Sequence, residues 1–255
     1  MTVVLPAGTM IAGYRVGGVL GKGGMGVVYE ARQLSLDRSV ALKVLIPELS
    51  ADPGFRERFR REGLIQARID HPNIVAVYEA GDHDGALFLV MRLVRGTTLK
   101  ELITPGGLDA ARALRLLRPV ADALDAAHDA GLVHRDIKPQ NILVGARDHV
   151  FLADFGLTRT GDRASGLTRS GQWLGTPDYM APEQIRGETP APAVDQYAIA
   201  AVLHECLTGE VPFPKQGDAA VLWAHMSDPP PLVSARRPDL PPGLDAVVAR
   251  GLAKH

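Results

Sequence analysis

The chain has 255 residues, of which 46% are hydrophobic and 22% are charged, and its formal net charge is −1. This balance is typical of a globular protein with a sizeable core, and it provides no overall basic field to favour a nucleic-acid partner. Because Cys206 is the only cysteine, an internal disulfide framework is excluded and a structural zinc site is disfavoured.

The first third of the chain is patterned as strands with one helix. Residues 52–69 show the helical spacing of apolar residues among arginine and glutamate. Short β-branched or apolar runs separated by glycines or polar turns predict strands at residues 14–20, 27–32, 39–45, 74–80 and 86–93. The polar run 81–85 predicts the turn between the last two strands.

Helical patterns dominate after Gly96. Residues 109–131 predict a long amphipathic helix that ends at Gly131, and Pro119 should kink or break it. The other expected elements are two short strands, a buried helix, a proline-rich connection and a final helix, at residues 142–144, 150–153, 194–208, 229–242 and 244–253. A strand-rich part followed by a helical part, with the boundary near residues 92–96, indicates an α+β architecture.

A glycine-rich motif, Gly-Lys-Gly-Gly-Met-Gly, occupies residues 21–26. Glycines at its first, third and sixth places let backbone N–H groups approach phosphate oxygens without obstruction by a Cβ atom. A dinucleotide-binding fold would open a helix here, whereas Val27, Val28 and Tyr29 continue as a strand-like run. This context favours a strand–turn–strand cover over nucleotide phosphates and disfavours a dinucleotide-dependent oxidoreductase; a plain hairpin is the other alternative.

Lys43 ends the apolar run Val40-Ala41-Leu42. A lysine in such a run usually lies on a solvated strand face. A phosphate-binding lysine needs a partner that holds it, and Glu62 on the following helix is a candidate. Gly63 follows directly and costs the helix about 0.5–1 kcal/mol relative to alanine, so we expect a helix that is readily displaced.

The most specific motifs lie in the second half of the chain. They are His134-Arg135-Asp136, followed by Lys138 and Asn141, then Asp154-Phe155-Gly156, and then Ala181-Pro182-Glu183. In this order and spacing they resemble the motifs of eukaryotic-type protein kinases, and are most similar to those of bacterial serine/threonine kinases. The resemblance extends from about Tyr14 to the last residue.

The resemblance implies one catalytic domain over residues 1–255 with a bilobal, protein-kinase-like fold. A small lobe with an antiparallel sheet and one helix is expected at about 10–92, a hinge at about 92–96, and a larger, mainly helical lobe at about 97–255. In relatives the chain continues to an arginine that pairs with the glutamate at the position of Glu183. This chain stops at His255, so we expect a truncation before the final helix. We also expect a buried Glu183 without its usual partner, at a cost of several kcal/mol.

The resemblance also implies the reaction, in which ATP donates its γ-phosphate to a serine or threonine hydroxyl of a protein. Asp136 would accept or orient the proton of that hydroxyl, and Lys138 would lie beside the γ-phosphate. Thr176 would bridge Asp136 and Lys138. Lys43, held by Glu62, would contact the α- and β-phosphates. His134 is expected to be structural.

ATP and Mg²⁺ are the cofactors that the resemblance implies, with Mn²⁺ as an alternative metal. Asn141 and Asp154 would hold the metal. Val28 and Ala41 would form the roof of the adenine pocket, Leu143 its floor and Met91 its rear. The full expected nucleotide set is Leu20, Gly21, Lys22, Gly23, Gly24, Gly26, Val28, Ala41, Lys43, Met91, Arg92, Val94, Asn141, Leu143 and Asp154. Of these, Arg92 and Val94 would contribute backbone groups to the adenine edge.

Regulation is expected in the loop between Asp154 and Glu183. Thr168 and Ser170 fall where bacterial relatives autophosphorylate, and Arg135 would pair with a phosphate on Thr168. The alternative is a loop that is merely polar.

Two functions remain open at this point, an active kinase and a non-catalytic nucleotide-binding scaffold of the pseudokinase type. Because every charged residue that the chemistry needs is present, the enzyme is favoured. Its partners would be proteins with serine or threonine, with no nucleic acid, and a homodimer is an open alternative. No apolar run reaches the ~18–20 residues that span a bilayer, so we expect a cytoplasmic segment without membrane contact, although a longer parent protein with an anchor stays open.

Overall fold

The protein is described here by a computed structural model that covers residues 4–155 and 177–254. The chain divides into two compact units, Met1–Arg95 and Gly96–His255. Each unit is a continuous stretch of sequence, so each builds its core from residues that follow one another along the chain.

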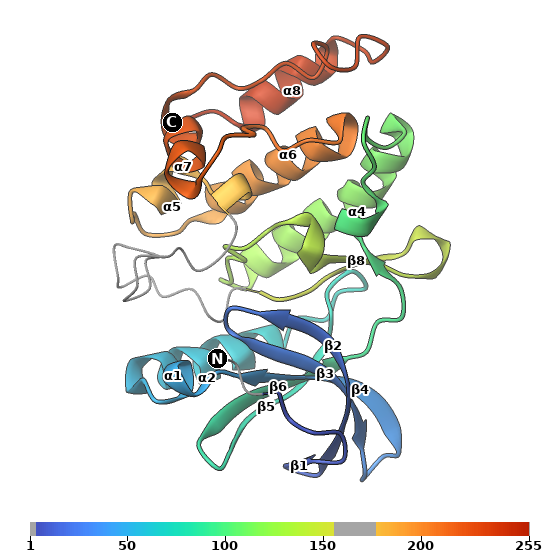
Figure 1. The fold of residues 1–255 in the computed structure, drawn as a ribbon, viewed down its shortest axis with the longest axis vertical. Coiled ribbons are helices and arrows are strands. Elements are labelled where there is room, and N and C mark those ends of the chain that lie inside the picture. The colour runs from blue at the N-terminus through green and yellow to red at the C-terminus, as the bar shows by residue number, and fades with distance from the viewer. Residues whose placement is uncertain (1–3, 156–176, 255) are drawn as a thin grey trace. The chain divides into compact units, whose positions relative to one another are not determined.

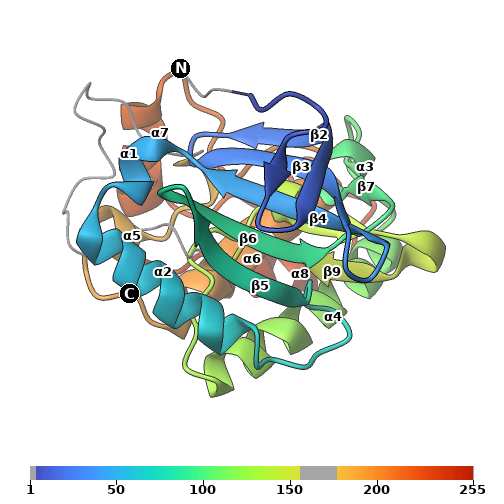
Figure 2. The same cartoon turned by 90° about the horizontal axis from the view of Figure 1, so that it is seen from below.

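The first unit contains a six-stranded antiparallel sheet with the strand order β1-β2-β3-β4-β6-β5 (Figure 2). Its strands are β1 Met10–Ile11, β2 Tyr14–Gly23, β3 Gly26–Gln33, β4 Arg38–Leu45, β5 Val77–His83 and β6 Ala86–Arg92. Tyr14 on β2 donates a hydrogen bond through its hydroxyl to Glu79 Oε2 on β5 at 2.6 Å. Since three strands lie between β2 and β5 in the sheet order, this contact requires the sheet to curl.

Two helices, α1 (Pro47–Ser50) and α2 (Pro53–Gln66), complete the first unit. Asp52 caps α2, because its Oδ1 accepts a hydrogen bond from the backbone N–H of Phe55 at 2.9 Å. Phe55 and Phe59 are buried on the inner side of the helix. A Cβ atom at Gly63 would lie 3.2 Å from the Ala80 Cβ, so the glycine lets α2 pack closely on β5 (Figure 2).

The second unit is mainly helical and carries a small three-stranded sheet with the order β7-β8-β9. Its α-helices are α3 Leu99–Leu102, α4 Ala110–Asp129, α5 Pro182–Ile185, α6 Pro192–Thr208, α7 Asp218–Ser227 and α8 Gly243–Gly251. Its strands are β7 Thr97–Thr98, β8 Ile142–Val144 and β9 Val150–Leu152, and its 3₁₀ turns are η1 Pro139–Asn141, η2 Ala146–Asp148 and η3 Pro177–Tyr179.

Helix α6 forms the centre of the second unit and lies between α4 and α8 (Figure 1). It is buried almost all round, as its apolar sequence predicts. A Cβ atom at Gly251 of α8 would lie only 2.5 Å from the Ala200 Cβ of α6, so the two helices meet closely at this glycine. Helix α4 continues through Pro119 as a single helix, so the helix is not broken there, and a kink at Pro119 stays a prediction.

The structure extends or adds elements where the sequence pattern is short or polar. Strand β5 continues to His83, so the turn to β6 consists only of Asp84 and Gly85, which have φ angles of 51° and 83°. A tight two-residue hairpin turn requires positive φ angles at both of its residues. Because the turn is this short, β5 extends through residues 81–83 of the polar run. Helix α7 and the shorter elements α1, α3, α5, β1 and β7 were not predicted.

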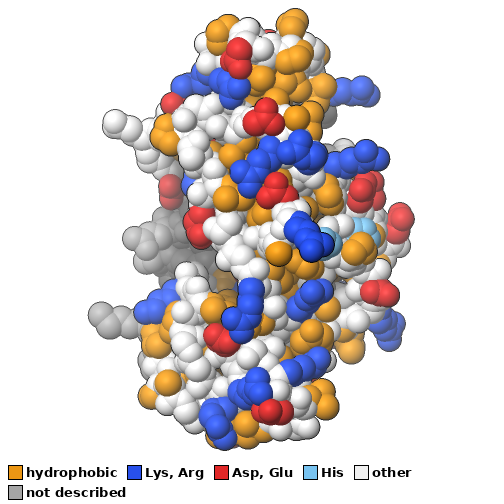
Figure 3. All heavy atoms as spheres, turned by 90° about the vertical axis from the view of Figure 1, so that its right-hand side faces the viewer, with side chains coloured by type: hydrophobic (Ala, Val, Ile, Leu, Met, Phe, Trp, Pro, Cys, Tyr) orange, Lys and Arg blue, Asp and Glu red, His pale blue; other side chains and the backbone are white. Residues whose placement is uncertain are grey.

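Within residues 4–155 and 177–254, no helix combines the length and hydrophobicity that crossing a membrane requires. On the face drawn in Figure 3, the lysine and arginine side chains lie among acidic and apolar ones.

Candidate active site

The loop that carries His134, Arg135 and Asp136 is anchored by Asp195 in the first turn of α6. Asp195 Oδ2 accepts a hydrogen bond from the His134 backbone N–H at 2.8 Å, and Oδ1 accepts one from the Arg135 N–H at 2.8 Å. His128 Nε2 on α4 also lies 2.8 Å from Oδ2. Because Asp195 is fully buried, these contacts provide the polar partners that its carboxylate needs. They also hold Arg135 in a left-handed conformation, with φ = 67°.

His134 is a structural residue of this loop, as expected. Its ring is buried and lies 4.6 Å from the Phe155 ring, centroid to centroid. Its Nδ1 accepts a hydrogen bond from the Asp136 backbone N–H at 3.2 Å, so the proton is on Nε2, which contacts the Ala153 carbonyl oxygen at 3.0 Å. Burial lowers the pKa of His134, which keeps the imidazole neutral in this arrangement.

Asp136, Lys138 and Asn141 form one hydrogen-bonded group. Lys138 Nζ lies 2.7 Å from Asp136 Oδ2. The Asn141 amide donates to the Asp136 backbone carbonyl at 2.7 Å and to Asp136 Oδ2 at 3.1 Å. Both contacts use the Asn141 nitrogen, so the amide oxygen is the atom that points elsewhere and is suited to a cation.

Asp154 is the second residue after β9, and the residue before it, Ala153, contacts this group. The Ala153 N–H donates to the Asn141 carbonyl at 2.9 Å, and Asp154 itself has a left-handed φ of 61°. Backbone of this kind is uncommon outside glycine and is concentrated at functional sites. The donors of Asn141 and Asp154 are hard oxygens, and such a pair fits Mg²⁺, which binds one or two carboxylates together with water and substrate phosphates. In the described part of the chain, no cluster of three or more His, Cys, Asp or Glu side chains offers a closed metal cage.

The first unit places several of the expected nucleotide-binding residues on one face of its sheet. Val28 pairs with Lys43 across β3 and β4, and Ala41 pairs with Met91 across β4 and β6. Residues directly opposite each other share a face, and so do residues two apart on a strand. Val28, Ala41, Lys43 and Met91 therefore lie on the same face. Glu62 is buried on α2 of the same unit.

The glycine motif forms the end of a hairpin, with Gly24 and Met25 between β2 and β3. The strand–turn–strand expectation is thus correct, and no helix follows the motif. Gly26 is required sterically, since its φ is 159° and a Cβ atom there would lie 2.2 Å from the Val44 carbonyl oxygen. Gly21 and Gly23 have no atom within 4 Å of a Cβ position, so their backbone faces open space. Leu20 and Lys22 are exposed on β2.

The remaining nucleotide residues lie at the end of β6 and on β8. The Arg92 backbone N–H donates to the Ala76 carbonyl at 2.9 Å, so this N–H is already engaged within the first unit. Val94 follows β6 and is partly buried. In the second unit, Leu143 pairs with Phe151 across β8 and β9.

The expectation for Glu183 requires a correction. Its side chain is only partly buried, so it does not incur the cost of a fully buried charge. The side chain emerges from the second residue of the short helix α5, where solvent reaches it. The predictions for Thr168, Ser170 and Thr176 concern residues outside the described ranges.

The structure also assigns roles to residues that the sequence motifs did not identify. Gln184 donates to the Arg135 carbonyl at 3.1 Å and accepts from the Ala181 N–H at 3.1 Å, so it connects α5 to the loop of Asp136. A small pocket with a volume of about 10 Å³ opens beside Asp136, and its walls are formed by Arg135, Asp136, Ile137, Tyr179, Met180, Gln184 and Ala198. The buried Glu205 on α6 contacts Tyr179 of this pocket and Lys100 of α3. The segment Asp195-Gln196-Tyr197 fits the buried helix of the kinase family, whereas an acidic residue in a largely apolar helix was the only signal in the sequence for Glu205.

Comparison with known proteins gives a consistent result. Residues 14–237 match the family model described as a protein kinase domain. The chain is 44% identical over 249 residues to the serine/threonine-protein kinase PknH of Mycobacterium tuberculosis H37Rv. The matched region covers 97% of this chain and 40% of that protein. It is 45% identical over 257 residues to PknJ of Mycobacterium bovis, covering 98% and 43%. The chain thus spans about two fifths of the length of these curated relatives.

A crystal structure of the Mycobacterium tuberculosis PknI kinase domain is also similar to this structure. The TM-score is 0.79 at 34% sequence identity, and the match covers 99% of this chain and 92% of that one.

Proposed function

The chain belongs to the protein kinase family, and on that premise we propose that it transfers the γ-phosphoryl group of ATP to serine or threonine hydroxyls of other proteins. The expected fold class agrees with the family match and with the similarity to a solved kinase domain. The activity of any longer protein that contains this domain is part of the same proposal.

The observation that carries the proposal is the group formed by Asp136, Lys138 and Asn141. Phosphoryl transfer requires little covalent chemistry from the protein and depends on positioning and on charge stabilisation. Asp136 Oδ2 is held by a lysine and an amide, so the carboxylate has a fixed direction from which to accept the proton of a substrate hydroxyl. Lys138 places a positive charge beside that oxygen, where charge develops on the phosphoryl group.

Asn141 and Asp154 are the residues that we expect to hold Mg²⁺. When bound, the metal would supply positive charge to the phosphate oxygens of ATP. In the first unit, Lys43 with Glu62 would orient the α- and β-phosphates, and the open backbone at Gly21 and Gly23 would face them. On the same sheet face, Val28 and Ala41 would cover the adenine ring and Met91 would lie at the rear of its pocket.

The protein substrate would approach the second unit at the pocket beside Asp136. Lys138, two residues after Asp136, is the arrangement of serine/threonine kinases, which supports aliphatic hydroxyls as acceptors. Thr168 and Ser170 are proposed to be sites of autophosphorylation, with Arg135 as a partner for the phosphate. Because ATP is the proposed co-substrate, the domain would act in the cytoplasm.

The test is incubation of the purified chain with γ-labelled ATP and Mg²⁺, followed by mapping of the labelled residues. Asp136→Asn should reduce transfer by about 10²–10⁴-fold, because the general base is lost, while ATP binding is retained. Asp239→Asn, on an exposed aspartate that pairs with Arg237, is the control and should retain full transfer. Equal transfer by wild type and Asp136→Asn would contradict the proposal.

A further inference from the structure

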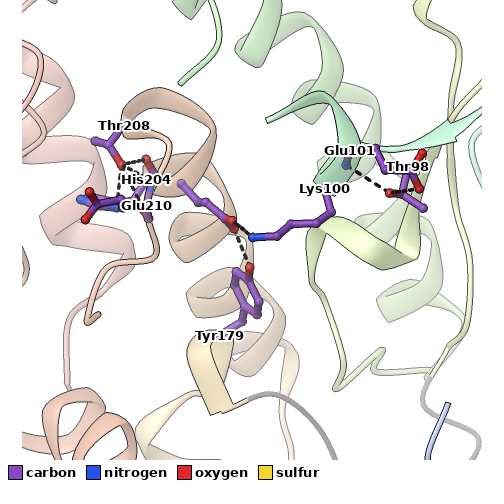
Figure 4. Close-up of polar contacts among 8 residues, drawn as sticks. Thr98, Lys100, Glu101, Tyr179, His204, Thr208 and Glu210 are labelled. Atoms are coloured by element: carbon purple, nitrogen blue, oxygen red, sulfur yellow. Dashed lines mark hydrogen bonds and ion pairs between the residues drawn. The ribbon is translucent and has the colours of Figure 1, made fainter. Parts of the chain in front are cut away.

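Glu205 is the centre of a second polar cluster in the large unit. It lies on α6 with 1% of its surface exposed, in a helix whose neighbouring residues are almost all apolar. Its Oε1 forms an ion pair with Lys100 Nζ at 2.5 Å. Its Oε2 accepts a hydrogen bond from the Tyr179 hydroxyl, also at 2.5 Å (Figure 4). Each carboxylate oxygen therefore has one strong partner, as a buried charge requires.

The two partners come from segments that are far apart in the sequence. Lys100 belongs to the short helix α3 and its side chain is 46% exposed, whereas Tyr179 is the last residue of η3 and lines the pocket beside Asp136. Lys100 itself is not among the residues that line this pocket. The contact of Lys100 with Glu205, and that of Glu205 with Tyr179, connect Lys100 to the wall of the pocket.

The charge of Lys100 matters because other acidic groups surround this position. Burial, together with the Glu205 carboxylate and Asp218, raises the pKa of Asp178, and Lys100 opposes this shift. Without Lys100, the positive charge that opposes the repulsion between Asp178 and the Glu205 carboxylate would be lost. Glu205 Oε1 would then lack its ion-pair partner inside the protein, and any movement of the side chain toward solvent would weaken its bond to Tyr179.

We propose that Lys100 is a positioning residue for the protein substrate, because it fixes Tyr179, and with it the wall of the pocket beside Asp136, through Glu205. This inference rests on the proposed kinase activity and deepens it. It predicts that Lys100 affects the affinity for the protein substrate and leaves the handling of ATP and the chemical step nearly unchanged.

The test uses the inactive Asp136→Asn chain, tagged for separation, as the protein substrate. Lys100→Met should raise KM for this substrate about five- to tenfold, while kcat and KM for ATP change less than about twofold. Lys100→Arg should restore the wild-type KM, because it keeps the charge. The matched control is Lys215→Met. Lys215 is 45% exposed, much like Lys100, and pairs with Asp228 at 3.0 Å. Its partner Asp228 is 35% exposed, however, whereas Glu205 is buried.

A second pair of variants tests the route through Glu205. In a Glu205→Gln background, Lys100→Met should have no further effect on KM, since the carboxylate that transmits its influence is gone. The inference would be overturned if Lys100→Met raised KM for ATP as much as KM for the protein substrate, or if it lowered only kcat. It would also be overturned if Lys215→Met raised KM for the protein substrate by the same factor.

A wild-type chain that labels no substrate would count against the proposed function, and amide exchange would then decide the inference separately. Lys100→Met should accelerate exchange in residues 177–184 while α4 stays protected. If Lys100→Met left amide exchange in residues 177–184 unchanged, the inference would be overturned, and this result does not depend on activity.

Discussion

The backbone N–H of His134 donates to Asp195 Oδ2 at 2.8 Å, although the two residues are 61 positions apart in the sequence. The other carboxylate oxygen accepts from Arg135, the residue before Asp136. One buried side chain on the central helix therefore sets the backbone of the loop that carries Asp136. The precision of the active site thus depends on how firmly α6 is packed.

Asp195→Asn should separate this role from simple charge loss. An asparagine has one acceptor oxygen, so one of the two backbone N–H groups loses its partner inside the protein. We expect the free energy of unfolding to fall by about 1–3 kcal/mol and kcat to fall with it. Urea denaturation and steady-state kinetics measure the two effects. Asp148→Asn, which removes the exposed ion pair with Arg112, should cost less than about 1 kcal/mol. Equal losses in the two variants would contradict the anchoring role.

Gly26→Ala tests the close approach at the glycine motif. The added Cβ would lie 2.2 Å from the Val44 carbonyl oxygen, so β3 and β4 would have to separate. We expect a loss of roughly 1–3 kcal/mol in unfolding free energy and a lower melting temperature. Gly23→Ala meets no atom within 4 Å and should melt like the wild type, even if it weakens ATP binding. Wild-type melting of Gly26→Ala would show that the approach is not constrained.

Stability should depend on pH through buried histidines, above all His225. Desolvation, with a contribution from Lys254, lowers the pKa of His225 from 6.5 to about 4. Between these values the unfolded chain binds a proton that the folded chain does not, so stability is complete above about pH 6.5 and falls as the pH is lowered toward 4. Burial also lowers the pKa of His134 and of His204, which adds to the effect with the same sign.

The wild type should lose roughly 1–3 kcal/mol of unfolding free energy through His225 between pH 7.5 and pH 5. His225→Gln should show a shallower dependence over the same range, whereas His83→Gln, at an exposed hairpin, should follow the wild type. Urea denaturation at a series of pH values provides the comparison. A wild-type slope retained in His225→Gln would assign the dependence to other groups.

The motifs that are contiguous in sequence were sufficient to predict the family, which the comparisons confirm. Asp136, Lys138 and Asn141 lie within six residues of chain, so their proximity follows from local structure. The register of β3, β4 and β6 likewise follows from alternation along strands. These are short-range relationships that a pattern of residue types can carry.

Relationships across long separations could not be predicted in this way. Lys100 and Glu205 are 105 residues apart, and nothing in either segment indicates the other. Gly63 provides another example, because the sequence shows only the cost of a glycine to a helix, whereas the structure shows the contact with Ala80 that a side chain would disturb. The partial exposure of Glu183 depends on how α5 sits in the large unit. Binding of the nucleotide by the individual site residues and a homodimer remain predictions.

The order of strands in the first sheet has a consequence for synthesis of the chain. Strand β6 pairs with both β4 and β5, so the last strand to be made is inserted between two that precede it. The sheet therefore cannot close until Arg92 has left the ribosome, only three residues before the division after Arg95. Folding during translation should proceed in two steps, with the small unit completed while the helices around α6 have still to be made.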